Sequence, residues 1–171
     1  MTMADALVTA RAAMVGRLLE QTLVVRDIDE TRSYLSRDFV LHIPLFPVLP
    51  KGPWAWTMAM KFFLGGLSGV RVELGDSFGD GELLALHFVV EGTHTGPFGT
   101  IAPTGKTMLV SALSLWRFHG TCIGEAAIAL GLWDALVRLD AVRLQDSVPM
   151  LVLGSAIEDE SGDAVTDPRQ Q

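Results

Sequence analysis

The side chains of this 171-residue chain best suited to proton transfer near neutral pH are four histidines scattered along the sequence. His42 could donate a hydrogen bond, shuttle a proton, or simply pair with a backbone carbonyl. His87 and His94 are an odd number of residues apart, so on one strand they would face opposite sides of a sheet. We expect His87 to make a polar contact, His94 to be structural and His119 to be solvated at a hairpin tip.

The sequence indicates neither a metal site nor a covalent serine site. The histidines form no His-x-x-x-His pair and have no cluster of cysteines beside them, because Cys122 is the single cysteine of the chain. Ser111 and Ser114 lack the Gly-x-Ser-x-Gly pattern of a nucleophile elbow. We therefore expect chemistry that needs no metal, no cofactor and no acyl-enzyme.

The stretch "GTIAPTGKT" (99–107) ends in the letters that close a phosphate-binding P-loop. A P-loop requires a glycine separated by four residues from its Gly-Lys-Thr, and here that position is Thr100. A helix must also follow, whereas residues 108–116 have the pattern of a strand. We predict a hairpin connection with Pro103 and Gly105 as turn residues, and no bound nucleotide.

The composition favours a cytoplasmic protein with either a large core or an apolar cavity and a subunit interface. Hydrophobic residues make up 49% of the chain and charged residues 19%, yet no uncharged run approaches the ~20 residues of a membrane helix. Residues 1–13 lack the pattern of a signal peptide. The net charge of −7 argues against a nucleic-acid partner, and a single cysteine fits a reducing compartment.

Helical patterns come first along the chain and strand patterns afterwards. Helical spacing runs over residues 5–25, Asp27 or Asp29 can cap a short helix through Leu35, and Pro53 can open a third helix. An extended, loop-like wall is expected over residues 37–53. The segments expected as strands are 70–76, 82–95, 107–118 and 121–130, and residues 134–145 are expected as a short helix or a sheet edge.

This order predicts an α+β fold: a cone-shaped, curved, mixed or antiparallel sheet with N-terminal helices that close an apolar pocket. We expect one domain over residues 1–154. The acidic tail, 155–171, is expected to be disordered. The apolar segment 148–154, "VPMLVLG", could be a lid, an interface strand or a swapped arm.

The segment "GTHTGPFGTIAPTGK" (92–106), preceded by "LLALHFVVE", resembles the corresponding segment of the SnoaL-like polyketide cyclase family. Arg117 and the "IGE" of residues 123–125 fall at that family's intervals, and "RDFVLHIP" with His42 also resembles it. The resemblance covers residues 10–142 and implies a homodimeric α+β cone of the nuclear-transport-factor-like type with a deep apolar pocket. It also implies ring closure or modification of polyketides without metal or nucleotide.

The last strand departs from that family, which usually has Glu-x-Trp-x-x-x-Asp there, with the Asp as the acid/base. In this register the Glu is Glu125, the Trp position is Ala127 and the Asp position is Gly131. Asp134 either reaches the pocket through an irregular strand end or caps a helix or faces solvent. If Gly131 faces the pocket, Ala129, Ala127 and Glu125 face it too. The exchange of Trp and Asp for Ala and Gly would then enlarge the cavity and remove the charge of that Asp.

The third helix, "PWAWTMAMKFFLGGL", is apolar nearly all round and must be buried on most sides. Its aromatic and thioether side chains are core or pocket walls, and the sequence leaves both open. The candidate pocket residues are Trp56, Met58, Met60, Phe63, Phe88, Ser114, Trp116, Ala127, Ala129 and Gly131. The candidate catalytic residues, which would polarise a carbonyl group, are His42, His87 and Trp54.

The leading hypothesis is a cofactor-independent cyclase that folds an apolar polyketide or polyene for intramolecular carbon–carbon ring closure, of the Diels–Alder type if no proton is transferred. A second hypothesis is an acid/base cyclase, isomerase or hydroxylase that uses His42, Asp134 or Glu125. A third is a non-catalytic protein that binds an apolar ligand.

Overall fold

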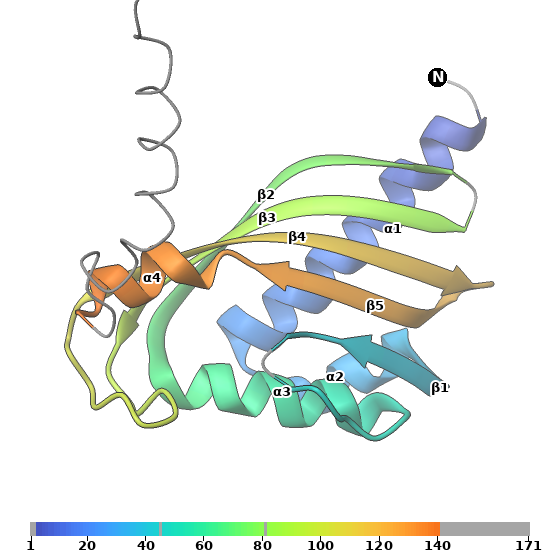
Figure 1. Ribbon diagram of the computed structural model, residues 1–171. Helices are drawn as coiled ribbons and strands as arrows, with labels where there is room; N and C mark the ends of the chain where they lie inside the picture. Colours follow the sequence, from blue (N-terminus) through green and yellow to red (C-terminus); the bar gives the residue numbers. More distant parts are fainter. Residues whose placement is uncertain (1–2, 45, 81, 141–171) are drawn as a thin grey trace, which may run out of the picture.

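The computed structural model describes residues 3–44, 46–80 and 82–140, which form an α+β fold (Figure 1). Helical segments open the chain and a sheet follows, as predicted. The elements are α1 (Met3–Leu19), the π-helical turn η1 (Glu20–Val25), α2 (Ile28–Thr31), the 3-10 turn η2 (Arg32–Tyr34), β1 (Leu35–His42), α3 (Pro53–Gly66), β2 (Leu67–Asp80), β3 (Leu83–His94), β4 (Thr107–His119), β5 (Cys122–Leu130) and α4 (Leu132–Arg138).

The five strands form one curved, mixed sheet with the order β1-β5-β4-β3-β2 (Figure 1). β2 through β5 are joined as antiparallel neighbours, and β1 adds to β5 in parallel. The sheet is strongly bent but does not close into a barrel. The helices α1 and α3 pack on the same side of it, which we call the inner face; the opposite side is the outer face.

Local sequence signals account for the start of the short helix α2 and of α3. The Asp27 side chain accepts a hydrogen bond from the backbone N–H of Glu30 at 3.1 Å, which caps α2 as predicted. α3 begins at Pro53 and is preceded by Gly52 at φ 93°. A Cβ on Gly52 would lie 2.9 Å from the carbonyl oxygen of Arg37, so the chain needs a glycine where it turns from β1 towards α3.

The strand β4 alternates strictly between buried and exposed positions, which defines the two faces of the sheet. Its even-numbered residues from Met108 to Phe118 are buried, and its odd-numbered residues are exposed. The largest fully buried side chains include Trp56, Trp116 and Phe39. The hydrophobic core therefore lies between the inner face and the helices.

The four predicted strands are confirmed as β2 to β5, and so are the turns at Gly105 and Gly120. Gly105 and Gly120 have positive φ angles of 69° and 63°, and Thr107–His119 is a strand rather than the helix of a P-loop. The expectation of a loop-like wall over residues 37–53 was wrong at its start. Residues up to His42 belong to β1, because buried side chains alternate there and the prolines begin only at Pro44.

The C-terminal expectations are tested only in part. The short helix predicted within residues 134–145 is α4, Leu132–Arg138. The segment 148–154 and the acidic tail 155–171 lie outside the described residues. No helix in the described part of the chain is long and apolar enough to cross a membrane.

Candidate functional site

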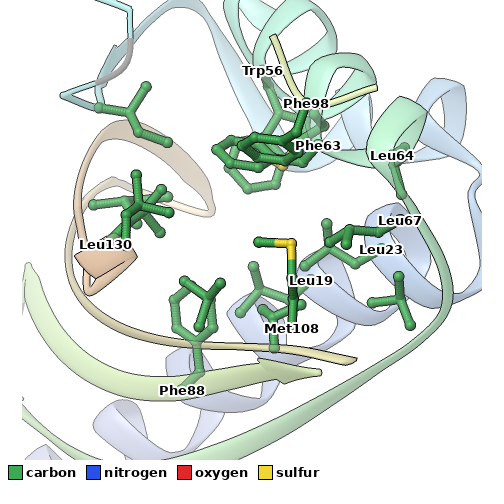
Figure 2. Close-up of a pocket in the computed structure, with 17 residues that line it drawn as sticks. Leu19, Leu23, Trp56, Phe63, Leu64, Leu67, Phe88, Phe98, Met108 and Leu130 are labelled. Carbon is green, nitrogen blue, oxygen red and sulfur yellow. The ribbon is translucent and has the colours of Figure 1, made fainter. Parts of the chain in front are cut away.

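A small apolar cavity lies between the inner face of the sheet and the helices α1 and α3 (Figure 2). Its volume is about 60 Å³, and its lining comprises 17 residues, none of which is titratable. The lining residues are Leu19, Leu23, Ile43, Trp56, Met60, Phe63, Leu64, Leu67, Val70, Phe88, Val90, Phe98, Met108, Val110, Ile128, Leu130 and Leu132.

Strand alternation places the sheet side of this lining. Phe88 and Val90 on β3, Val110 on β4 and Ile128 and Leu130 on β5 all project from the inner face. Their neighbours along each strand project to the outer face. The cavity therefore contacts the bulky, apolar face of β5, and the walls hold no group that could transfer a proton.

Aromatic rings make the cavity narrow. The rings of Phe63 and Phe98 lie 5.7 Å apart between centroids, and those of Phe62 and Phe98 lie 4.9 Å apart in an edge-to-face arrangement. A Cβ on Gly66 would come within 2.6 Å of the Phe98 ring, so this glycine makes room for the ring. The Phe63, Trp56 and Phe98 rings gather on one side of the cavity (Figure 2).

Two tryptophans fill the inner space beside the cavity, and their polar atoms are satisfied. The Trp56 and Trp116 rings lie 6.0 Å apart, and Trp56 Nε1 donates to the Thr22 hydroxyl at 3.0 Å. Trp116 Nε1 donates to the Ser114 hydroxyl at 2.8 Å, and that hydroxyl donates to the Leu86 carbonyl at 2.8 Å. Ser114 and Trp116 therefore serve packing, and neither lines the cavity.

The expectation that Ala127, Ala129 and Gly131 enlarge the inner wall was wrong. Ala127 and Ala129 project from the outer face, because the neighbouring Ile128 and Leu130 are the residues that line the cavity. Gly131 is not on the strand at all; it is the exposed N-cap of α4. The bulky face of the last strand packs against the helices, as the alternation predicted.

The small residues hollow the outer face instead. A second hollow of about 740 Å³ lies there, open to solvent. One row of paired residues crosses its floor from β2 to β1: Phe78, Ala85, Leu115, Ala127 and His42. Alanine at two of these positions leaves the space between the larger side chains.

The polar candidates also lie on the outer face. His42 Nε2 is 3.0 Å from a carboxylate oxygen of Glu125, and Arg117 Nε donates to the other oxygen at 3.2 Å. His87 Nε2 lies 2.9 Å from the Ser111 hydroxyl. His42 borders the outer hollow, whereas His87 borders neither hollow, so the structure separates both histidines from the inner cavity.

The remaining candidates divide between surface and cavity. Trp54 is 52% exposed, with Arg32 and Lys61 near its ring, and Met58 is 44% exposed. Neither lines a hollow, which corrects both expectations. The candidates that do line the inner cavity are Trp56, Met60, Phe63 and Phe88.

Asp134 lies on α4 and is exposed, so it does not supply an acid inside the cavity. Across the described ranges, no three His, Cys, Asp or Glu side chains come close enough to hold a metal ion.

Sequence reasoning missed several lining residues, above all Leu19, Leu23 and Phe98. Leu19 and Leu23 lie at the junction of α1 and η1, four residues apart, so that both can project from one face. Phe98 lies in the turn that was considered only as a connection. The helical spacing was a usable signal for Leu19 and Leu23; nothing in the sequence directs the Phe98 ring inward.

A bent sheet with helices closing its inner face over an apolar cavity defines a cone-shaped α+β protein. The family model described as SnoaL-like polyketide cyclase matches residues 13–129, and the chain belongs to this family. Comparison with curated protein sequences gives no match.

Solved structures show the same fold at low sequence identity. AclR, a proposed hydroxylase from Streptomyces galilaeus, matches with 20% identity and a TM-score of 0.70, covering 80% of this chain and 99% of its own. A proposed SnoaL-like polyketide cyclase from Jannaschia sp. CCS1 matches with 17% identity and a TM-score of 0.68, covering 80% and 96%. IdmH, a proposed polyketide cyclase from Streptomyces antibioticus, matches with 21% identity and a TM-score of 0.65, covering 75% and 98%.

Proposed function

We propose that this chain is a cofactor-independent, cytoplasmic cyclase of polyketide biosynthesis that binds the apolar part of a linear polyketide or polyene in the inner cavity. The observation that carries the proposal is the composition of the lining, in which none of the 17 residues is titratable. Such a cavity can hold and orient a substrate, but it offers no general acid or base. Ring closure of the Diels–Alder type suits it, because that reaction requires neither.

In that reaction a conjugated diene and an alkene of the same chain combine. Two carbon–carbon σ bonds form, three π bonds are lost, one new π bond appears, and no atom leaves. The protein contributes by holding the reacting carbons close together, which in ideal cases lowers the barrier by ~7–11 kcal/mol. Rigid walls such as the Trp56 and Phe63 rings are suited to that task.

The volume restricts the substrate. About 60 Å³ is small beside the roughly 300–1,000 Å³ of pockets that hold drug-sized ligands. A slim, unbranched apolar segment fits such a space best. A fused aromatic system would require aromatic walls such as Phe63 and Phe98 to move, so the narrowness favours a polyene over an aromatic polyketide.

A second copy of the chain is the proposed partner for the outer face. Leu113 on β4 is 58% exposed, Leu115 is 42% exposed and Leu109 is 40% exposed, while Phe78 on β2 is 69% exposed. These side chains gather on one face of the sheet, and contiguous apolar patches of this kind mark interaction sites. The homodimer implied by the family resemblance would cover them.

The experiment that tests the proposal compares two substitutions on neighbouring positions of β4. The substrate is a model compound in which a conjugated diene is tethered to an enone, and its ring closure is followed with and without protein. Wild type should accelerate closure over the spontaneous rate. Val110→Phe should abolish most of the acceleration because the new ring enters the cavity, whereas Leu109→Phe, on the outer face, should retain it.

Equal rates with and without wild-type protein, for this compound and for linear polyene intermediates, would reject the cyclase. Saturable binding without turnover would then favour the non-catalytic apolar-ligand protein. Acceleration that survives Val110→Phe but not Leu109→Phe would move the site to the outer face.

One observation favours acid/base chemistry as a second candidate function. His42, Glu125 and Arg117 form a linked polar group, and His42 borders the outer hollow. A cyclase, isomerase or hydroxylase that used this group would show an ionisation limb in its pH–rate profile. Glu125→Gln would remove that limb, and under the leading proposal it should leave the rate within twofold of wild type.

A further inference from the structure

One side chain of the cavity lining, that of Met108 on β4, extends furthest from the sheet into the space between the walls. Met108 is 1% exposed and lines the inner cavity. Figure 2 shows its side chain rising from β4 towards the middle of the lining residues, with the sulfur and the methyl group at its tip. The end of this side chain therefore limits the cavity from the side of the sheet.

Among the strands that the structure describes, those beside β4 place no side chain directly across from Met108. Its partner on β3 is Gly92, which has no side chain. On the other side, the pairing of β4 with β5 starts at Ala112 and Leu130, so Met108 lies beyond the end of that ladder. Directly opposed side chains are the closest neighbours on a sheet. Met108 lacks one on both sides, and its tip is free of that restriction.

The aromatic walls, by contrast, are held by specific contacts. Trp56 Nε1 donates to the Thr22 hydroxyl at 3.0 Å, so turning the indole would break a buried hydrogen bond. The Phe98 ring packs edge to face on Phe62 at 4.9 Å between centroids. The backbone of Phe98 also exchanges two hydrogen bonds with Ile101, at 3.0 and 3.1 Å. Movement of either ring would therefore disturb more than the cavity.

The chemistry of methionine adds to this difference. Its side chain is unbranched, with three rotatable bonds and a polarisable thioether, and adapts to irregular spaces. The valine and isoleucine side chains of the lining are stiff at χ1. Met60, the other methionine of the lining, lies one helical turn from both Trp56 and Leu64 on α3, and both of these also line the cavity. Met108 is thus the lining side chain with the greatest freedom to move.

We propose that Met108 is the adjustable wall of the inner cavity and sets the length of chain that the site accepts. Rotation of its side chain away from the cavity admits a longer chain than about 60 Å³ can hold. Each further methylene group that enters leaves water and strengthens binding about fourfold. The fixed walls prevent expansion elsewhere, so the ligand class is a linear, unbranched apolar chain.

This inference rests on the proposed function and assigns it a specificity-determining residue. The cavity is small for a polyketide site, and it can lengthen at Met108 while the Trp56 and Phe98 rings keep their places. Those rings can then still orient the reacting carbons. Met108 itself takes no part in bond formation; it determines which chains fit.

The test uses two linear conjugated dienes, 1,3-pentadiene and 1,3-nonadiene, which differ only in the length of the saturated tail. Dissociation constants are measured by NMR titration for wild type, Met108→Ile and Met58→Ile, with the methyl group of Met60 in the cavity as the reporter. Isoleucine keeps the wall filled but is stiff at χ1. Met58 is 44% exposed and lines neither hollow, so the same change there is the matched control.

Wild type should bind nonadiene at least about tenfold more tightly than pentadiene. Met108→Ile should weaken the binding of nonadiene by about tenfold or more and that of pentadiene by less than about threefold. Met58→Ile should change both dissociation constants by less than about twofold. A Met108→Ile variant that keeps the preference for the longer diene, or that loses affinity equally for both, would overturn the proposal.

Wild type alone provides a second measurement if Met108→Ile does not fold. The ¹³C shift of a methionine methyl group depends on the rotamer of its side chain, so the Met108 methyl should shift further with nonadiene than with pentadiene. The exposed Met58 methyl should not shift. Binding of pentadiene alone, or of both dienes without that difference, refutes the role of Met108 and leaves the cavity as a binding site. Failure of both dienes to bind refutes the cavity as the ligand site, and with it the proposed function.

Discussion

The inner face of β4 and β5 is almost wholly apolar, whereas the outer face mixes apolar and polar side chains, and the space beside each face differs in size and openness. On the inner face, Ile128 and Leu130 line an apolar cavity of about 60 Å³. On the outer face, Ala127 and Ala129 border an open hollow of about 740 Å³, with the His42–Glu125 pair beside it. Bulky side chains thus border a small apolar space, and small side chains leave a larger hollow that is open to solvent.

The side chains that could orient a substrate and the side chains that could transfer a proton therefore lie on different faces of the sheet. The inner face has walls that can orient a substrate and no titratable group among its lining residues, whereas the outer face has the titratable groups and no enclosing wall. An acid/base mechanism needs both in one place. In the part of the chain that the structure describes they occur on opposite sides of the sheet, which is why the leading proposal relies on orientation.

The largest expected effect comes from a charge introduced on the inner face of β5, compared with the same charge on its outer face. Ile128→Asp buries a carboxyl group in the apolar interior and should cost more than about 4 kcal/mol of unfolding free energy or prevent folding. Ala129→Asp, at the adjacent residue, should change the unfolding free energy of the separated chain by less than about 0.5 kcal/mol, because this side chain is exposed on the outer face. Urea denaturation followed by circular dichroism measures both. A similar loss of unfolding free energy in both variants would contradict the assignment of Ile128 to the buried face and Ala129 to the exposed face.

The next largest effect is a loss of unfolding free energy on removal of a buried tryptophan of α3, compared with removal of an exposed one on the same helix. Trp56→Ala removes a fully buried ring that packs on Trp116, and should cost about 3–5 kcal/mol of unfolding free energy. Trp54→Ala, at a position 52% exposed, should cost less than about 1 kcal/mol. Thermal and urea unfolding of the two variants provide the values. A Trp54 variant as unstable as the Trp56 variant would mean that the inner side of α3 is misassigned.

A third substitution tests the outer face as an interface between copies. Leu113→Arg places a charge in the centre of the exposed apolar side chains and should weaken dimerisation by at least about tenfold, the equivalent of about 1.4 kcal/mol. The unfolding of the separated chain should change little. Light scattering coupled to size exclusion, over a range of concentrations, measures the dissociation constant. A variant as dimeric as wild type would contradict the proposed interface.

The smallest effect concerns an exposed carboxyl group on β1. The Ser36 hydroxyl donates to Asp38 at 2.8 Å, and this bond holds the pKa of the Asp38 carboxyl below its ordinary value. The stabilisation is present above the ordinary pKa of Asp and is lost as the pH falls through the lowered, folded-state value. Ser36→Ala should raise the pKa of Asp38, as measured by carbon-detected NMR titration. An unchanged pKa would show that the bond is not maintained in solution.

Much of the fold was predictable because its signals are local. Asp27 and Pro53 mark helix starts by capping chemistry, and the alternation over 107–118 marks a strand. The strand β1 was missed because its partner, β5, is about 85 residues further along the chain. A single parallel edge strand next to proline-rich sequence also resembles a loop. Long-range pairing of this kind has no local signature.

The site was predictable in character but not in position. The sequence correctly indicated an apolar interior, and it placed Trp56, Met60, Phe63 and Phe88 in the pocket wall. The wrong face of β5 was assigned to the pocket. Side chains alternate along a strand, so an error of one residue in the assumed orientation reverses the face. That assumption rested on Gly131, which begins α4 instead of ending the strand.

The pH dependence of catalysed ring closure tests the central claim most directly. The claim is that the reaction takes place among the inner lining residues, none of which is titratable. We predict that the ratio of catalysed to spontaneous rates for the diene–enone compound stays constant within about twofold between roughly pH 5 and 9, where every side chain in the lining keeps its state. A sharp ionisation limb in that range, abolished by Glu125→Gln or His42→Gln, would contradict the account and place the chemistry on the outer face.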